Sequence, residues 1–277
     1  MRSANPQPAA PATGPFTGAF QGLAHRGGGL EQFENSPSAF QHAAALGYRY
    51  IETDLQASND GVLYLFHDDD LARCSTGTGR FSDHGSEAID RLRLKNGEAI
   101  PRLADILARY PQITLNADVK TDACIRPVTR FLQTSPHRAR LVLASFSTRR
   151  LRAIRRAVKD TRPDITRPDM SMADISKTNL YMTGGQADIA ALYAGQWIGA
   201  LRPPPICAAQ IPPRHYGIEL ATPRFIRHCH AHHIKIHVWT INDPDEMRRL
   251  IRLGVDGICT DRPTILREVL AEFDLTP

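Results

Sequence analysis

The sequence predicts an α/β fold in which parallel strands alternate with helices around a closed barrel of eight strands. The chain has 277 residues, of which 42% are hydrophobic, and a single α/β barrel commonly takes about 250 residues. Short apolar runs alternate with amphipathic stretches along most of the chain, which is the pattern of a parallel sheet with crossover helices. Ionisable residues gather at the carboxyl ends of these runs, where a parallel barrel builds its active site.

The first half of the chain supplies apolar runs of strand length and amphipathic stretches of helix length. The apolar runs are 20–25, 50–58, 62–67, 113–120 and 141–146. The amphipathic stretches are 37–47, which follows a potential capping hydroxyl at Ser36, and 100–110. Residues 68–100 interrupt the alternation, and we expect them to form an insertion after the strand that ends at His67.

The second half repeats the pattern after a stretch without a clear period. Residues 160–205 do not reveal where the fifth strand lies. Beyond them, strand-like and helix-like patterns alternate at 206–211, 222–233, 234–241, 243–254 and 256–261. At the other end of the chain, residues 1–18 are rich in Pro, Ala and Gly and are expected to form a disordered tail. Residues 19–277 are therefore assigned to a single barrel domain.

Composition excludes several classes of protein. The formal charge is +5, but no helix-turn-helix, zinc-finger or RNP pattern accompanies it, so we expect a small phosphorylated substrate and no nucleic-acid partner. The five cysteines are widely spaced and never form a C-x-x-C pair, so neither a disulfide framework nor a zinc knuckle is expected. No apolar stretch of membrane-spanning length and no signal-peptide pattern occur, which predicts a cytoplasmic protein without a stable membrane anchor.

Acidic side chains are spaced for a cation site at the carboxyl ends of two runs. Side chains two residues apart on a strand point the same way. Glu52 and Asp54 should therefore project together into the barrel mouth, and so should Asp118 and Lys120. Three converging carboxylates without His or Cys ligands favour one hard divalent cation, Ca²⁺ or Mg²⁺, over zinc.

Six segments of the chain together carry a family resemblance. They are HRGGGLEQFENS (25–36), YIETDLQASNDGVLYLFHDDDLARCSTGTG (50–79), LNADVK (115–120), SF (145–146), VWTIN (238–242) and GVDGICTDRP (254–263). In this order they resemble the glycerophosphodiester phosphodiesterases. The resemblance implies a TIM barrel with a short insertion, here residues 68–100. It also implies an enzyme that cleaves glycerophosphodiesters to sn-glycerol 3-phosphate and an alcohol.

The resemblance implies a role for each matching residue. His25 and His67 correspond to a general acid/base pair, which phosphodiester cleavage needs to activate a nucleophile and to protonate the leaving oxygen. The other implied positions are metal ligands (Glu52, Asp54 and Asp118), phosphate-binding cations (Arg26 and Lys120) and substrate contacts (Glu34 and Trp239). Asp118 stands where many members carry glutamate, which predicts a shifted cation or an altered cation preference with activity retained.

Other interpretations of these residues stay open. A lysophospholipase D-like activity would use the same chemistry on a lipid, but it would need an apolar channel or a membrane-docking face. A non-catalytic glycerophosphodiester-binding barrel would be supported by a damaged histidine or ligand set, whereas both histidines and all three carboxylates are present. The acidic triplet 68–70 could tune His67, but a solvated turn is the preferred interpretation. The sequence indicates neither the alcohol released nor the oligomeric state.

Overall fold

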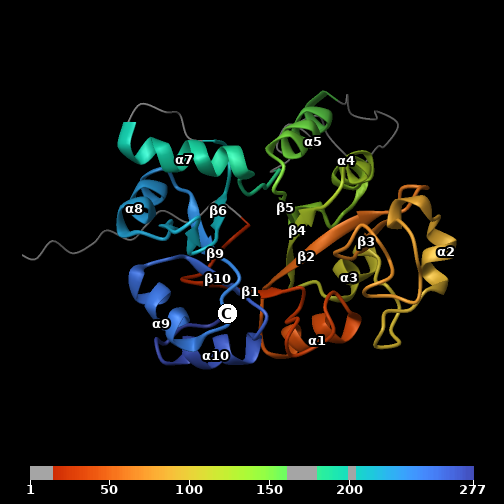
Figure 1. The fold of residues 1–277 in the computed structure, drawn as a ribbon, viewed down its shortest axis with the longest axis horizontal. Coiled ribbons are helices and arrows are strands. Elements are labelled where there is room, and N and C mark those ends of the chain that lie inside the picture. Colours follow the sequence, from red (N-terminus) through yellow and green to blue (C-terminus); the bar gives the residue numbers. More distant parts are fainter. Residues whose placement is uncertain (1–14, 161–179, 199–203) are drawn as a thin grey trace, which may run out of the picture.

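Parallel strands form the centre of the molecule, and helices lie around them (Figure 1). The computed structural model describes residues 15–160, 180–198 and 204–277. Neighbouring parallel strands follow the order β5 (Leu141–Ala144), β4 (Thr114–Val119), β2 (Tyr50–Ala57), β1 (Gln21–His25), β10 (Gly257–Thr260), β9 (Lys235–Val238) and β6 (Ala208–Ile211). These neighbouring strands therefore follow one another in chain order around the ring, and β1 lies beside β10, as a barrel of successive strand–helix units requires.

The ring of strands closes at a very short segment between β5 and β6. Met182 forms a parallel bridge to Leu143 of β5, and Thr183 forms a parallel bridge to Ala208 of β6. This segment takes the place of the fifth barrel strand, which the sequence could not locate because two bridging residues leave no periodic pattern. The eight-stranded TIM barrel predicted from the sequence is therefore confirmed.

Helices cover the outside of the ring (Figure 1). They are α1 (Pro37–Ala45), α3 (Leu103–Arg109), α4 (Ile125–Thr134), α5 (Thr148–Asp160), α7 (Gln186–Ile198), α8 (Pro223–Ala231), α9 (Pro244–Leu253) and α10 (Pro263–Ala271). Ser36, Thr222 and Asp243 each accept a backbone hydrogen bond at the start of a helix whose first residue is proline. Caps and prolines thus fix where α1, α8 and α9 begin. No helix within the described ranges combines the length and apolar character needed to cross a membrane.

Residues 68–100 leave the barrel and pack around an apolar cluster of their own. The short strand β3 (Leu63–Leu65) pairs antiparallel with β2, and the excursion that follows contains the helix α2 (Ser86–Arg91). Tyr64, Phe66 and Phe81 belong to the separate cluster of buried residues beneath it. This packing fixes the start of the excursion beside β2.

Phe16 lies inside the barrel, although the sequence placed it in a disordered tail. Its side chain is 2% exposed, and its ring packs against His237 and Tyr50 with centroid distances of 4.5 and 5.4 Å. Tyr50 begins β2, so Phe16 fills the end of the barrel opposite the mouth. The expected tail boundary at residue 18 is therefore wrong for residues 15–18, and the rest of that tail lies outside the described residues. A single apolar residue among prolines and glycines has no period that would reveal its burial.

Candidate active site

The parallel register brings the acidic residues of β2 next to ionisable residues of both neighbouring strands. Glu52 of β2 pairs with His25 of β1, and Asp54 of β2 pairs with Asp118 of β4. His25 ends β1 and Asp118 lies near the end of β4, so the register places the side chains of this group at the barrel mouth. A buried ionisable cluster results.

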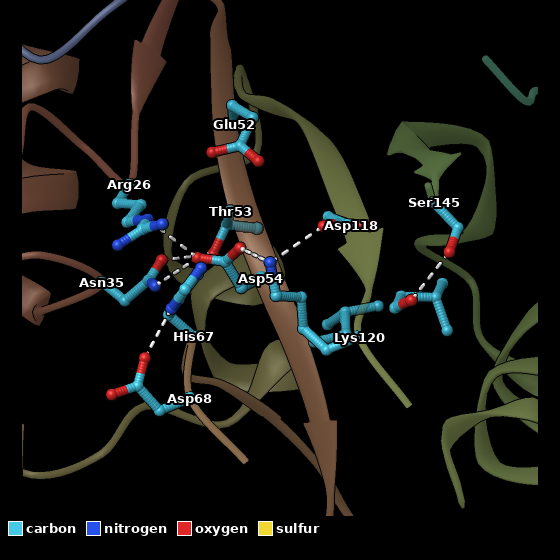
Figure 2. Close-up of polar contacts among 12 residues, drawn as sticks. Arg26, Asn35, Glu52, Thr53, Asp54, His67, Asp68, Asp118, Lys120 and Ser145 are labelled. Atoms are coloured by element: carbon cyan, nitrogen blue, oxygen red, sulfur yellow. Dashed lines mark hydrogen bonds and ion pairs between the residues drawn. The ribbon is translucent and has the colours of Figure 1, made fainter. Parts of the chain in front are cut away.

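Asp54 is the centre of this cluster (Figure 2). Its carboxylate is 2% exposed and lies 3.1 Å from Nε of Arg26 and 3.1 Å from Nζ of Lys120. It also accepts a hydrogen bond of 2.9 Å from Asn35. Burial favours the neutral acid, but Lys120 and Arg26 outweigh it and lower the pKa of Asp54 below its ordinary value. Asp54 is therefore a fixed negative charge that positions two cations.

Lys120 lies between two of the predicted cation ligands. Its Nζ is 3.0 Å from Asp118 and 3.1 Å from Asp54. Burial opposes the charged form of Lys120, but Asp54 and Asp118 outweigh it and raise its pKa. Within the part of the chain that the structure describes, no three His, Cys, Asp or Glu side chains are grouped as metal ligands. Glu52, Asp54 and Asp118 therefore do not form a ready set of cation ligands, and two of them share the Lys120 ammonium group.

Among the described residues, one carboxylate oxygen of Glu52 has no hydrogen-bond partner, and neither has the amide oxygen of Asn116, its register partner on β4. Oε2 is buried without a donor and lies 3.6 Å from Nε2 of His25. Burial, followed by the negative charge of Asp54, raises the pKa of Glu52 well above the usual range of a carboxyl group. A buried carboxylate oxygen without a donor costs free energy until a proton or a cation neutralises it. Glu52 is therefore the position that best fits an incoming cation.

His25 is held by a carboxylate from the neighbouring strand. Its Nδ1 lies 2.6 Å from Oδ1 of Asp261, which directly follows β10. The other oxygen of Asp261 accepts a hydrogen bond of 2.9 Å from Asn242. Burial disfavours a charged ring, but Glu52 and Asp261 outweigh it and raise the pKa of His25 above its ordinary value. Nε2, beside Glu52, is left available for proton transfer.

His67 has an equivalent carboxylate in the following residue. Its Nδ1 lies 2.5 Å from Asp68, and both oxygens of Asp68 also accept hydrogen bonds from Arg73, at 2.5 and 2.8 Å. Arg73 donates a further hydrogen bond of 2.6 Å to Glu34, which contacts Arg26 at 3.0 Å. The preferred interpretation of the triplet 68–70 as a solvated turn is therefore wrong for Asp68, whereas Asp69 and Asp70 are exposed. Through Arg73, the excursion 68–100 connects His67 to the loop after β1.

Trp239 follows β9 and lies half-buried at the mouth. Its ring packs edge-on against Phe146, with 5.6 Å between the ring centroids. Phe146 follows β5 and is 54% exposed. The two rings form an apolar surface next to the charged cluster.

The structure distributes the predicted site residues between two polar networks. One network contains His25 and Glu52. The other contains His67, Arg26, Glu34, Asp54, Asp118 and Lys120. Trp239 takes part in neither network.

Two residues of these networks, Asp261 and Arg73, were missed from the sequence. Asp261 ends the apolar run 256–261, so the signal that singled out the other strand-end residues could have found it. Asn35 lies within a matching segment, and it joins Asp54 to Thr53. Arg73 lies within the matching segment 50–79, but no periodicity in the excursion singles it out from its neighbours.

The sequence of this chain matches the Glycerophosphoryl diester phosphodiesterase family over residues 25–265. It is 35% identical over 259 residues to the probable glycerophosphodiester phosphodiesterase 2 of Mycobacterium tuberculosis, which covers 90% of this chain and 89% of that protein. It is 24% identical over 276 residues to the lysophospholipase D GDPD1 of Homo sapiens, covering 91% of this chain and 86% of that protein. The chain therefore belongs to the glycerophosphoryl diester phosphodiesterase family, which is a family of hydrolases.

Solved structures share the fold. The glycerophosphoryl diester phosphodiesterase domain of a Mycobacterium tuberculosis protein superposes with a TM-score of 0.71 at 17% identity, covering 92% of this chain and 100% of that chain. An Oleispira antarctica phosphodiesterase in complex with the product sn-glycerol-3-phosphate gives a TM-score of 0.68 at 19% identity, covering 91% and 96% of the two chains. At these identities the likeness establishes the TIM barrel.

Proposed function

We propose that this chain hydrolyses glycerophosphodiesters to sn-glycerol 3-phosphate and an alcohol, with two histidines as acid and base and one divalent cation. The Mycobacterium tuberculosis relative is named for this activity, and the Oleispira antarctica structure contains the product. The observation that carries the proposal is that His25 and His67, at one barrel mouth, each have Nδ1 within hydrogen-bond distance of a carboxylate.

A carboxylate at Nδ1 fixes the orientation of an imidazole and leaves Nε2 for proton exchange. In the proposed reaction, one histidine takes a proton at Nε2 from the attacking oxygen, which is either water or the 2-hydroxyl of glycerol. Attack by the 2-hydroxyl would give a cyclic phosphodiester, which water must then open to give sn-glycerol 3-phosphate. The other histidine is protonated and donates from Nε2 to the leaving oxygen. Asp261 and Asp68 would stabilise the imidazolium form of His25 and His67, respectively.

Arg26 and Lys120 are the proposed ligands of the phosphate. Their side chains are 17% and 18% exposed, and both contact Asp54. Cations beside the non-bridging oxygens stabilise the negative charge that concentrates there in the transition state. Glu34 also contacts Arg26 and is proposed to orient its guanidinium group, while Trp239 is proposed to contact the glycerol moiety.

The proposed cation is Ca²⁺ or Mg²⁺, with Glu52, Asp54 and Asp118 as the residues that would hold it. The two networks contain six carboxylates, which are Glu34, Glu52, Asp54, Asp68, Asp118 and Asp261. Among the described residues, the permanent cations of these networks are Arg26, Arg73 and Lys120. This excess of negative charge and the unpartnered oxygen of Glu52 fit an oxygen-preferring divalent cation. When bound, the cation would supply Lewis-acid stabilisation to phosphate oxygens.

A second candidate function is a lysophospholipase D-like cleavage of a lipid headgroup. The apolar surface that Phe146 and Trp239 form at the mouth favours it, because an acyl chain could pack there. The similarity to the human lysophospholipase D GDPD1 also supports this candidate. Both candidates use the same two histidines.

The test measures release of sn-glycerol 3-phosphate by the purified protein from glycerophosphocholine and glycerophosphoethanolamine. We expect EDTA to abolish release and Ca²⁺ or Mg²⁺ to restore it. Glu52→Gln should lose this activity, whereas Glu268→Gln, at an exposed position on α10, should keep it. Release that resists EDTA would contradict cation dependence. Turnover of lysophosphatidylcholine alone would favour the second candidate, and turnover of neither substrate class would overturn both.

A further inference from the structure

The outer face of α4 and α5 carries a concentration of positive charge that the proposed reaction does not use. The two helices pack side by side at one edge of the barrel (Figure 1). α4 contains no acidic residue, and the only acid in α5 is Asp160, at its last position. The exposed cations of this surface, the basic face, are Arg126, Arg130, Arg149, Arg152, Arg156 and Lys159.

Among the described residues, ion pairs neutralise two of these cations. Arg149 pairs with Asp122, and Arg152 pairs with Asp188 at 3.3 Å. No ion pair within the described ranges neutralises the other four cations, which are Arg126, Arg130, Arg156 and Lys159. The formal charge of the whole chain is only +5, so the basic face holds much of the excess.

The arrangement is unfavourable for the helices themselves. Arg126 and Arg130 are spaced i,i+4 on α4, and Arg152 and Arg156 have the same spacing on α5. Like charges at this spacing repel and destabilise a helix. The pattern is therefore not explained by helix stability, and it suits contact with a polyanion.

The contact would be electrostatic, because α5 has no apolar side free to insert. Leu151 and Ile154 of α5 are buried in the barrel core. At its mouth end, however, α5 begins two residues after Phe146, which is 54% exposed. Aromatic side chains favour the boundary between membrane and water. One exposed aromatic residue, Phe146, therefore lies beside the basic face at the barrel mouth.

We propose that the basic face is a reversible docking surface for an anionic lipid bilayer. Clusters of Lys and Arg are attracted to the negative surface potential of such bilayers, and the attraction fades within a Debye length. A nucleic acid is less well matched, because Phe146 is the one exposed ring beside the described part of the basic face, whereas single-stranded nucleic acids are bound on successive aromatic side chains. A glycerophosphodiester is also the deacylated polar part of a glycerophospholipid. Docking here brings Phe146 and the mouth close to the lipid surface.

The test is co-sedimentation of the full-length chain with vesicles of phosphatidylcholine, with and without phosphatidylglycerol. We expect binding only to the phosphatidylglycerol vesicles at low salt, and its loss at high salt. Arg130→Glu/Arg156→Glu should weaken binding about tenfold or more. The matched control is Arg227→Glu/Arg267→Glu, which makes the same charge change at exposed positions of α8 and α10 and should bind like the wild type.

Three results would overturn the proposal. The first is that the wild type does not bind phosphatidylglycerol vesicles at low salt. The second is that both double variants lose binding equally, which would assign the effect to overall charge. The third is that a duplex oligonucleotide binds the basic face more tightly than the vesicles do in direct competition, which would assign the face to nucleic acid. Salt-sensitive binding that only Arg130→Glu/Arg156→Glu loses would support the proposal.

Discussion

Asp261 lies 2.6 Å from Nδ1 of His25 and holds the ring from the adjacent strand of the barrel. Asn242 donates to the same carboxylate at 2.9 Å, so Asp261 is itself fixed. The pairing sets the tautomer of His25, with the proton on Nδ1 and the lone pair on Nε2. His67 and Asp68 repeat this arrangement on the other side of the site.

Replacing Asp261 with asparagine should impair catalysis without unfolding the barrel. The amide would favour the wrong tautomer of His25, and we expect kcat to fall about 100-fold or more. Steady-state kinetics on glycerophosphocholine would measure the loss. Asp274→Asn, at an exposed position near the C-terminus, should keep wild-type kcat. Unchanged kcat in Asp261→Asn would contradict the role of this carboxylate.

Lengthening the side chain at position 118 should strengthen cation binding. Asp118 now contacts Lys120 at 3.0 Å, and a glutamate there would extend one methylene further into the mouth. We expect Asp118→Glu to lower the half-activating concentration of Ca²⁺ or Mg²⁺ about tenfold and Asp118→Asn to raise it by a similar factor. Titration of activity with each cation after EDTA treatment would measure both shifts. Identical half-activating concentrations in the three proteins would place the cation elsewhere.

Truncating Phe16 should destabilise the whole barrel. Its ring is 2% exposed against His237 and Tyr50, so Phe16→Ala leaves a cavity and should lower the free energy of unfolding by about 3 kcal/mol. Urea unfolding would measure this change. Phe146→Ala is the matched control, because that ring is 54% exposed and its loss should cost less than about 1 kcal/mol. Equal stability of the two variants would show that Phe16 does not belong to the core.

His237 should make the fold sensitive to mild acid. Burial lowers its pKa to about 4, whereas an unfolded histidine titrates near 6.5. Between these values the unfolded chain binds a proton that the folded chain does not, so stability falls as the pH falls through this window. The full effect is about 3 kcal/mol.

Urea unfolding at several pH values within this window would test the prediction for His237. His237→Gln should lose less stability on acidification than the wild type does. His232→Gln changes an exposed histidine and should behave like the wild type. Parallel pH dependence of His237→Gln and the wild type would show that another group is responsible.

The strands and the ionisable residues near their carboxyl ends could be predicted, because both follow from the repeat of apolar side chains along each strand. Residues two apart on a strand share a side, so Asp118 and Lys120 were expected together, and their side chains lie 3.0 Å apart. The short bridge at Met182 and Thr183 and the burial of Phe16 could not be predicted, because neither leaves a period in the sequence.

The pairings between distant loops were equally inaccessible from the sequence. Asp261 reaches His25 only because β10 lies beside β1. Arg73 reaches Asp68 and Glu34 only because the excursion 68–100 folds back over the loop after β1. Lys120 was predicted to bind phosphate, and its ammonium group also contacts two of the expected cation ligands, Asp54 and Asp118. The contact with Asp54 joins two strands, so spacing along one strand does not reveal it.

The central claim is that His25 and His67 move protons in opposite directions during one cleavage, so that one is the base and the other the acid. The most direct measurement compares His25→Ala and His67→Ala on glycerophosphocholine and on the p-nitrophenyl ester of glycerol 3-phosphate, whose leaving group needs no proton. On glycerophosphocholine we expect both variants to lose about 10²–10⁴-fold in kcat. On the p-nitrophenyl ester, only the variant that lacks the acid should recover most of its activity. Wild-type turnover by either variant on glycerophosphocholine, or the same loss in both variants on both substrates, would contradict the two-histidine mechanism.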